Sequence, residues 1–306
     1  MAKRNIADVF SDFRSNSIAA AHRYEQACAQ NSDLAAIREQ IQQAGLAKLE
    51  CALTGKSEQP YDIELERLAA REKEILQSQV AAPRYRCEAC RDTGAIGSEY
   101  CTCLLDLLYL ECYNAVDIES SPISFNTFDF SVYEDEVVLP NGRTQRQWAE
   151  LFVKHAKKYV DDFPKTSKQN ILISGKAGLG KSYLMYAMAK YAKQRGIDTL
   201  LMRANDMFSL FHAHRMGEEI DLAYMHGAKL LLVDDIGTEP ITQNVSNEYF
   251  YDLIDRRLRN GLHTVFATNV NDLQKRYDDR ISSRLQSDND CLQFFFDGQD
   301  LRIDKS

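Results

Sequence analysis

The sequence of 306 residues has no long apolar run, and this absence limits where the protein can act. No segment approaches the ~18 consecutive apolar residues that a membrane-spanning helix needs, so we expect no membrane partner. The first residues, M-A-K-R-N-I-A-D-V-F, contain two basic side chains but no apolar stretch behind them, so we expect no secretory signal. We therefore expect a cytoplasmic protein, in which thiols stay reduced.

The sequence also lacks an excess of positive charge, internal repeats and low-complexity tracts. Its 37 Lys and Arg residues are outnumbered by 45 Asp and Glu residues, which gives a formal net charge of −8. This balance argues against a generally basic coat for nucleic acid, but it is compatible with a local basic groove. The apolar content of 44% suffices for a real core, and the length favours about two domains at ~150 residues each.

The cysteines are unevenly distributed, because half of the eight lie between residues 87 and 103. Cys87 and Cys90 form a C-x2-C pair, and Cys101 and Cys103 form a C-x-C pair after ten intervening residues. In a reducing compartment, two such arms direct four thiolates at one point and complete the tetrahedral shell of a structural zinc ion. Unconnected thiols and a redox pair are the alternatives; the redox pair is disfavoured because no strand–helix pattern surrounds this C-x2-C.

The N-terminal part of the chain is predicted to contain two regions. Residues 1–81 are rich in Ala, Gln and Glu with apolar residues at helical spacing, so we expect a helical arm. Residues 82–116 contain the four cysteines and are expected to form a small zinc module. The two regions together are interpreted as one partner-binding domain.

The remaining sequence is predicted to contain a linker and an α/β domain. Residues 117–145 show no helical period, and we expect Phe125, Phe128 and Phe130 to dock this linker on a neighbouring surface. In residues 146–306, short apolar runs alternate with amphipathic helices. That alternation is typical of a parallel sheet sandwiched by helices.

A phosphate-binding loop follows the first apolar run of this domain. Residues 175–182 read G-K-A-G-L-G-K-S, which is the G-x4-G-K-[ST] motif with a predicted strand before it and a predicted helix after it. Its glycines let the backbone wrap a phosphate, and the amides at the helix N-terminus point at that phosphate. We therefore predict ATP and Mg2+ as cofactors, with binding residues Gly175, Gly178, Leu179, Gly180, Lys181, Ser182 and Tyr183 and with Ser182 as a magnesium ligand.

Polar side chains follow two further predicted strands. K-L-L-L-V-D-D-I-G ends in Asp234, expected to hold Mg2+, and Asp235, expected to orient the attacking water. A glutamate is commoner than Asp235 in related ATPases, and the shorter side chain favours slow, partner-tuned hydrolysis. H-T-V-F-A-T-N ends in Asn269, whose amide is expected to sense the γ-phosphate. Arg280 and Arg284 lie four residues apart, and we expect them to reach the ATP of a neighbouring subunit.

Together these motifs resemble the AAA+ ATPases of the DnaC/DnaI helicase-loader group. The resemblance covers residues 120–306, including F-N-T-F-D-F and the late D-G-Q-D-L-R, where Arg302 occupies the position of a final arginine. The four-cysteine segment resembles the zinc module that DnaI-type loaders have before their ATPase. The resemblance implies ATP–Mg binding by Lys181 and Ser182, metal and water positioning by Asp234 and Asp235, a first sensor in Asn269, and a trans-acting arginine finger in Arg284 supported by Arg280.

The resemblance implies an ATP-dependent loader that places the hexameric replicative DNA helicase on single-stranded DNA and self-associates through shared ATP sites. The alternative is an IstB-type transposition helper ATPase, whose core has the same signatures. Such helpers lack a helical arm followed by a four-cysteine module, which favours the loader. A non-catalytic zinc adaptor is disfavoured because only one cysteine cluster is present and the ATPase motifs are complete. Basic residues expected along a DNA path are Arg203, Lys229, Arg256, Arg257 and Arg259.

Overall fold

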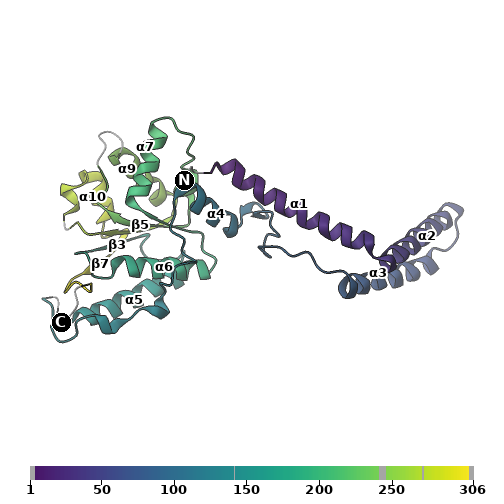
Figure 1. Cartoon of the computed structure of the whole chain (residues 1–306), viewed down its shortest axis with the longest axis horizontal. Helices are drawn as coiled ribbons and strands as arrows, with labels where there is room; N and C mark the ends of the chain where they lie inside the picture. Colours follow the sequence, from purple (N-terminus) through teal and green to yellow (C-terminus); the bar gives the residue numbers. More distant parts are fainter. Residues whose placement is uncertain (1–3, 141, 241–245, 271, 303–306) are drawn as a thin grey trace. The chain divides into compact units, whose positions relative to one another are not determined.

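The structure is a computed structural model that describes residues 4–140, 142–240, 246–270 and 272–302. Its contacts divide the chain into two compact units, Ile6–Leu104 and Leu105–Ser306, the second of which also includes Met1–Asn5. Figure 1 follows the chain through both units. The four regions expected from the sequence (1–81, 82–116, 117–145 and 146–306) remain a prediction.

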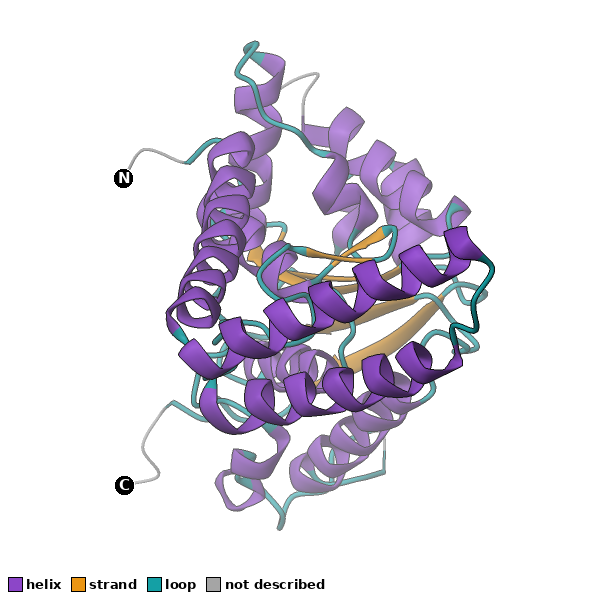
Figure 2. Cartoon of the chain, turned by 90° about the vertical axis from the view of Figure 1, so that its right-hand side faces the viewer, coloured by secondary structure: helices purple, strands orange, loops and turns teal. Residues whose placement is uncertain are grey.

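The first unit begins with three long helices, as the composition predicts. They are α1 (Ile6–Gln30), α2 (Ser32–Thr54) and α3 (Gln59–Gln79). The Asn31 side chain caps α2 by accepting a hydrogen bond from the Leu34 amide. Helix α2 ends at Gly55, whose φ of +67° favours glycine. Helices are purple in Figure 2 and account for most of the described structure outside the central strands.

Helices α2 and α3 pack as an antiparallel hairpin. Arg38 on α2 pairs with Glu72 on α3 at 2.8 Å, and Lys48 pairs with Asp62 at 2.7 Å, which fixes the register of the two helices. Leu34 and Ile75 are buried between them, together with Cys28 of α1. The exposed ion pairs add little stability, so the buried apolar residues are the main source of it.

The four-cysteine segment follows this hairpin within the same unit. It contains a two-stranded antiparallel hairpin, β1 (Ala95–Ile96) and β2 (Glu99–Tyr100). Helix α4 (Thr102–Tyr113) starts directly after the third cysteine of the cluster.

The second unit is built on a parallel sheet of five strands in the order β4-β5-β6-β3-β7. Every apolar run that predicts a strand is a strand, so the expected parallel sheet is confirmed. The order places β6 between β3 and β5, which brings the carboxyl ends of these three strands together. The strands are β3 (Asn170–Gly175), β4 (Thr199–Arg203), β5 (Leu230–Ile236), β6 (His263–Thr268) and β7 (Cys291–Phe296).

Helices cover both faces of this sheet (Figure 1). On one face, α5 and α6 bury their apolar side chains against Val265 and Ala267 of β6. On the other face, Phe250 of α9 packs edge-to-face against both Phe266 of β6 and Phe208 of α7. The α/β fold with helices on both sides is therefore confirmed. The helices of this unit are α5 (Gln145–Asp161), α6 (Lys181–Gln194), α7 (Ala204–Arg215), α8 (Ala223–Gly227), α9 (Ser246–Arg259) and α10 (Asp279–Leu285).

The predicted linker docks on this second unit. Two short 3-10 helices pack on the second unit: Phe125–Thr127 lies against α6, and Phe130–Val132 lies against α5. Phe125 packs against Tyr191 and Phe128 against Tyr183, with ring centroids 5.3 and 5.1 Å apart. The expected docking of the phenylalanines is thus observed. Among the described residues, no helix combines the length and apolar character needed to span a membrane.

Candidate ATP site and cysteine cluster

The phosphate loop links the end of β3 to the start of α6. Gly178 and Gly180 have φ angles of +79° and +91°, which side chains rarely adopt. A Cβ atom at Gly180 would also lie 2.2 Å from the Tyr133 hydroxyl, so glycine is required there for space as well. The loop thus has the backbone geometry that the motif predicts, and the N-terminus of α6 opens directly onto it.

Lys181 is buried at the base of the loop. Its ammonium group donates a 2.5 Å hydrogen bond to the Lys176 carbonyl oxygen. Burial lowers the pKa of Lys181, while the nearby carboxylates of Asp235 and Asp234 act in the opposite direction. The lysine is therefore held at the base of the loop, where it would interact with a bound phosphate.

The acidic residues predicted for metal and water lie at the end of β5, beside the loop. The Ser182 hydroxyl donates a hydrogen bond of 3.1 Å to the Asp234 carboxylate, so the two expected magnesium ligands adjoin each other. Burial and the neighbouring Asp235 raise the pKa of Asp234. Asn269, at the end of β6, donates a 2.8 Å hydrogen bond to the Asp235 carboxylate. The structure therefore brings Ser182, Asp234, Asp235 and Asn269 together, and their oxygen-rich set suits Mg2+.

The two arginines expected to act on a neighbouring subunit lie on α10. Arg284 donates hydrogen bonds of 2.8 Å to the Asp255 carboxylate and 2.8 Å to the Tyr251 hydroxyl of α9. Arg280 lies over the same Tyr251 ring and pairs with Asp278 at 3.1 Å. Arg280 is the more exposed, with 64% of its side chain accessible against 30% for Arg284. Their action in trans remains a prediction.

One of the basic residues expected along a DNA path is not on the surface. Arg257 is fully buried, and its guanidinium donates to the carbonyl oxygens of Met225, His226, Ala228 and His263. Burial lowers its pKa, and the ring of carbonyl oxygens compensates for the lost hydration. The prediction for Arg257 is therefore wrong, because this arginine stabilises the fold. Its helical neighbour Arg256 is exposed and pairs with Asp252 at 2.7 Å.

A C-terminal turn within the late D-G-Q-D-L-R motif also contacts the loop. The Leu301 amide donates a 2.9 Å hydrogen bond to the Gly178 carbonyl oxygen. A Cβ atom at Gly178 would lie 1.7 Å from an oxygen of Asp300. The sequence contains Asp300 within D-G-Q-D-L-R, but its contact with the loop depends on β7 lying beside β3, which no local pattern specifies.

The four predicted zinc ligands converge in the first unit. Their sulfur atoms all lie within 4.8 Å of one another, with 3.8 Å between Cys87 and Cys101 and 3.5 Å between Cys90 and Cys103. A tetrahedral ZnS4 shell with bonds of ~2.3 Å has sulfur–sulfur edges of about 3.8 Å, so the donor set fits zinc. The buried cluster is therefore consistent with a zinc module.

Hydrogen bonds hold the backbone on both sides of the cysteine cluster. The Asp92 carboxylate accepts hydrogen bonds from the amides of Arg86 and Cys87, at 3.1 and 2.9 Å. The Cys101 amide donates to the Gly94 carbonyl oxygen at 2.8 Å, which closes the loop between the two arms. Both arms are thus positioned by hydrogen bonds that do not involve the thiols.

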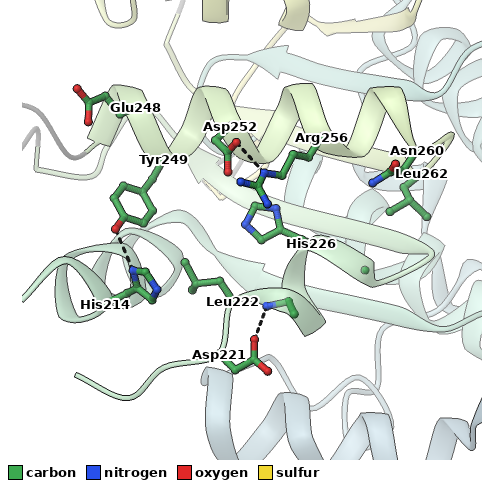
Figure 3. A pocket seen from close by; sticks show the side chains of 12 residues that line it. His214, Asp221, Leu222, His226, Glu248, Tyr249, Asp252, Arg256, Asn260 and Leu262 are labelled. Carbon is green, nitrogen blue, oxygen red and sulfur yellow. Dashed lines mark hydrogen bonds and ion pairs between the residues drawn. The ribbon is translucent and has the colours of Figure 1, made fainter. Parts of the chain in front are cut away.

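A cavity of about 700 Å³ lies among α7, α8 and α9, and no sequence motif indicates it. Figure 3 shows Tyr249 pointing toward His214, and Asp252 paired with Arg256 above His226. Burial lowers the pKa of His226, and its Nδ1 atom has no hydrogen-bond partner among the described residues. The lining residues do not include those of the phosphate loop, so this cavity is separate from the ATP site.

Comparison with known proteins supports the interpretation that the second unit contains an ATP-binding domain. Residues 142–276 match the family model described as IstB-like ATP binding protein. The chain is 26% identical over 106 residues to the ATP-binding protein named for insertion sequence IS232 of Bacillus thuringiensis subsp. berliner, which covers 34% of this chain and 42% of that protein. It is 27% identical over 183 residues to the corresponding IS5376 protein of Geobacillus stearothermophilus, which covers 52% of this chain and 72% of that protein. The chain thus spans less than half the length of the IS232 protein.

Solved structures with a similar arrangement include AMPPCP-bound DnaA from Aquifex aeolicus (20% identity, TM-score 0.43) and DnaI (22% identity, TM-score 0.42). The first match covers 58% of this chain and 51% of the other, and the second covers 60% and 95%. The DnaC helicase loader is also similar, at 20% identity and a TM-score of 0.42 over 56% of this chain and 98% of that one.

The parallel sheet, the phosphate loop and the paired aspartates together define an ATP-binding domain of the AAA+ P-loop class. Within that class, residues 142–276 are similar to the family described as IstB-like ATP binding protein.

Proposed function

We propose that the protein is an ATP-dependent loader that places the hexameric replicative DNA helicase on single-stranded DNA. The observation that supports this proposal is the separate unit Ile6–Leu104, which contains a helical hairpin and a four-thiol cluster but no phosphate-binding motif. It lies outside the region matched by the family model, residues 142–276. A unit that is independent of the ATP site is suited to choosing a partner.

The helical hairpin in this unit has an exposed apolar surface. Leu46, Leu49 and Leu53 lie three and four residues apart on α2, so they share one helix face, and they are 57%, 57% and 79% exposed. The α2 residues that face α3, such as Lys48, lie elsewhere around the helix. Three aligned leucines in water favour a protein partner, because burying them on association would be stabilising. We assign this leucine face to the helicase contact.

The cysteine cluster would hold a zinc ion with a structural role. Four thiolates from Cys87, Cys90, Cys101 and Cys103 leave no open position, so the zinc would supply folding energy and no catalytic water. The ion would fix the β1–β2 hairpin and the start of α4, which are too short to be stable alone.

The ATP site has the residues for phosphoryl transfer to water. The loop amides and Lys181 would bind the phosphates, and Ser182 with Asp234 would hold Mg2+, which neutralises charge on the phosphate oxygens. Asp235 would orient the attacking water, and its hydrogen bond from Asn269 fixes the direction of that carboxylate. DNA contacts would come from exposed basic side chains such as Arg256 and Arg259, which are 58% and 69% accessible.

The proposal is tested by capture of the purified host replicative helicase with the full chain. We expect wild type to bind it and Leu49→Asp to lose most of this binding, because a charge on the leucine face disrupts an apolar contact. Val137→Asp is the matched control, since Val137 is also an exposed aliphatic residue (55%) but lies in the ATPase unit. ATP binding by both variants should equal that of wild type. Helicase binding that is unaffected by Leu49→Asp would exclude the leucine face, and no helicase binding by wild type would exclude the loader.

The second candidate function is an IstB-type transposition helper. It is favoured by the two sequence relatives, both named as insertion-sequence proteins. This candidate predicts ATP-dependent binding to duplex DNA and capture of a transposase. It further predicts that residues 6–104 are dispensable for both.

A further inference from the structure

A buried carboxylate that has no part in the expected chemistry lies directly after β5, in the turn that follows Asp235. Glu239 is 1% exposed, which makes it the most deeply buried acidic residue in the part of the chain that the structure describes. One of its carboxylate oxygens accepts a 2.7 Å hydrogen bond from the Gly237 amide. Glu239 therefore closes the turn next to the residue that is expected to orient the attacking water.

The second oxygen of this carboxylate bonds to the segment that leads into α10. The Tyr277 hydroxyl donates a 2.5 Å hydrogen bond to it, and the Tyr277 ring packs against Phe250 with centroids 5.2 Å apart. Burial and the neighbouring carboxylate raise the pKa of Tyr277, so its hydroxyl keeps the proton that it donates. The next residue, Asp278, caps α10 by accepting a 3.0 Å hydrogen bond from the Ile281 amide. The side chain that Glu239 holds thus directly precedes the cap of α10.

The charge of Glu239 is compensated by one arginine. The Arg276 guanidinium lies 3.5 Å from the Glu239 carboxylate and also donates a hydrogen bond to the Glu239 carbonyl oxygen. Its Nε atom is buried and has no hydrogen-bond partner among the described residues. Buried ion pairs add little net stability, because the cost of desolvation offsets the attraction between the charges. Stability is therefore a weak reason for a charged residue at this position.

We propose that Glu239 is a positioning residue for ATP hydrolysis, which acts through Tyr277 to orient α10 so that Arg284 reaches the ATP of a neighbouring subunit. An arginine stabilises charge on a phosphate only when its donors lie within hydrogen-bond distance, so the orientation of α10 decides its effect. Glu239 itself does not touch the nucleotide. This role rests on the ATPase part of the proposed function and on the expected action of Arg284 in trans, and it is independent of the helicase.

Removal of one hydroxyl group tests this role with little change in packing. Tyr277→Phe breaks the bond to α10 and keeps both the ring against Phe250 and the bond from Gly237 to Glu239. Steady-state ATP hydrolysis is measured at a concentration at which wild-type activity per subunit no longer rises. We expect kcat to fall about tenfold and KM for ATP to stay unchanged, because the arginine is displaced and the ATP pocket is intact. Glu239→Gln should have a larger effect, since an amide has one accepting oxygen for two donors.

Tyr109→Phe is the matched control for a purely structural effect. Tyr109 is also buried, and its hydroxyl donates a 2.9 Å hydrogen bond to the carboxylate of Asp198, which precedes β4 at the amino ends of the strands. Both Tyr→Phe variants should lower the melting temperature by about 2–4 °C, because each loses one buried hydrogen bond. Only Tyr277→Phe should lower kcat.

A mixing experiment identifies the subunit in which Tyr277 acts. Lys181→Ala chains supply only the arginine, and Arg284→Ala chains supply only the ATP pocket. Adding Tyr277→Phe to the Lys181→Ala chain should lower the activity of the mixture about tenfold, because the displaced α10 belongs to that chain. Adding it to the Arg284→Ala chain should leave the activity of the mixture unchanged. A loss of general stability would not show this asymmetry.

Two results would overturn the positioning role alone. One is a normal kcat in Tyr277→Phe when Arg284→Ala is slow, and the other is an equal loss whichever chain of the mixture has Tyr277→Phe. Normal hydrolysis by Arg284→Ala, or an inactive mixture of Lys181→Ala with Arg284→Ala, would overturn it together with the action of Arg284 in trans. Absence of ATP hydrolysis by wild type at every concentration would overturn the ATPase function as well.

Discussion

The Asn269 side chain donates a 2.8 Å hydrogen bond to the Asp235 carboxylate, and this bond joins the ends of β6 and β5 at the ATP site. Asp235 has a φ of +59°, in the left-handed region that residues other than glycine adopt only uncommonly. The amide thus fixes the orientation of the residue expected to position water. Hydrolysis should depend on both members of the pair, and binding of ATP should depend on neither.

The first prediction separates binding from hydrolysis. Asp235→Asn should bind Mg–ATP with wild-type affinity and hydrolyse it at least about a hundredfold more slowly, because the group that orients and accepts a proton from water is lost. Asn269→Ala should reduce hydrolysis by about tenfold, since the carboxylate stays but is less well oriented. Steady-state phosphate release and nucleotide calorimetry measure the two quantities. Normal hydrolysis by Asp235→Asn would contradict the assigned role.

The second prediction concerns the cost of burying Asp234. Burial raises its pKa, so the ionised form destabilises the folded state, and this cost is present above the folded-state pKa and relieved as pH falls through it. Asp234→Asn should therefore raise the melting temperature of the nucleotide-free protein at neutral pH by on the order of 2 °C. The same variant should lose Mg2+-dependent stabilisation by ATP. The difference in melting temperature between variant and wild type should shrink as the pH is lowered.

The third prediction concerns the cysteine cluster. Protein purified without chelator should contain about one zinc per chain, and chelation should unfold the β1–β2 segment because metal binding is coupled to folding. Cys90→Ser should lose the metal, whereas Cys51→Ser, at a cysteine outside the cluster, should retain it. Metal analysis measures the zinc content, and circular dichroism measures the unfolding. Absence of zinc from wild type would exclude the zinc assignment.

The fourth prediction concerns the arginines of α10. Arg284→Ala should keep ATP binding but lose partner-stimulated hydrolysis, since an arginine finger contributes roughly 10³–10⁵ in rate in well-studied NTPases. Mixing Arg284→Ala with Lys181→Ala should restore part of the activity, because one subunit supplies the finger and the other the pocket. Because Arg284 is bonded to Asp255 and Arg280 is freer, Arg280→Ala should be compared in the same assay. No rescue at any mixing ratio would argue against action in trans.

The sequence predicted the strands and the phosphate site because both depend on local patterns. An apolar run flanked by turns specifies a buried strand, and the spacing of Gly175, Gly180 and Lys181 specifies the loop. The convergence of Asp235 with Asn269 followed from strands being parallel, although the order that makes them neighbours was not predicted. Local pattern was therefore sufficient to predict the loop and the side chains that meet at the strand ends, whereas their catalytic roles remain predictions.

Local pattern failed where burial or distant contact decides the role. Arg256 and Arg257 are adjacent in R-R and look equivalent, yet one is exposed and the other is buried. Only the helix face presented to the sheet distinguishes them. Likewise, the contact between Asp300 and Gly178 joins residues far apart in sequence through the β3–β7 pairing.

The buried Arg257 has a consequence for local opening of the fold. Its guanidinium bonds to the carbonyl oxygens of Met225, His226 and Ala228 in and after α8, and to His263 at the start of β6. Opening the short helix α8 would leave the buried Arg257 guanidinium without several of its hydrogen-bond partners. This helix therefore cannot fray as surface helices of five residues do. Its amide protons should therefore exchange with solvent on the timescale of the central sheet, as one cooperative unit with β6.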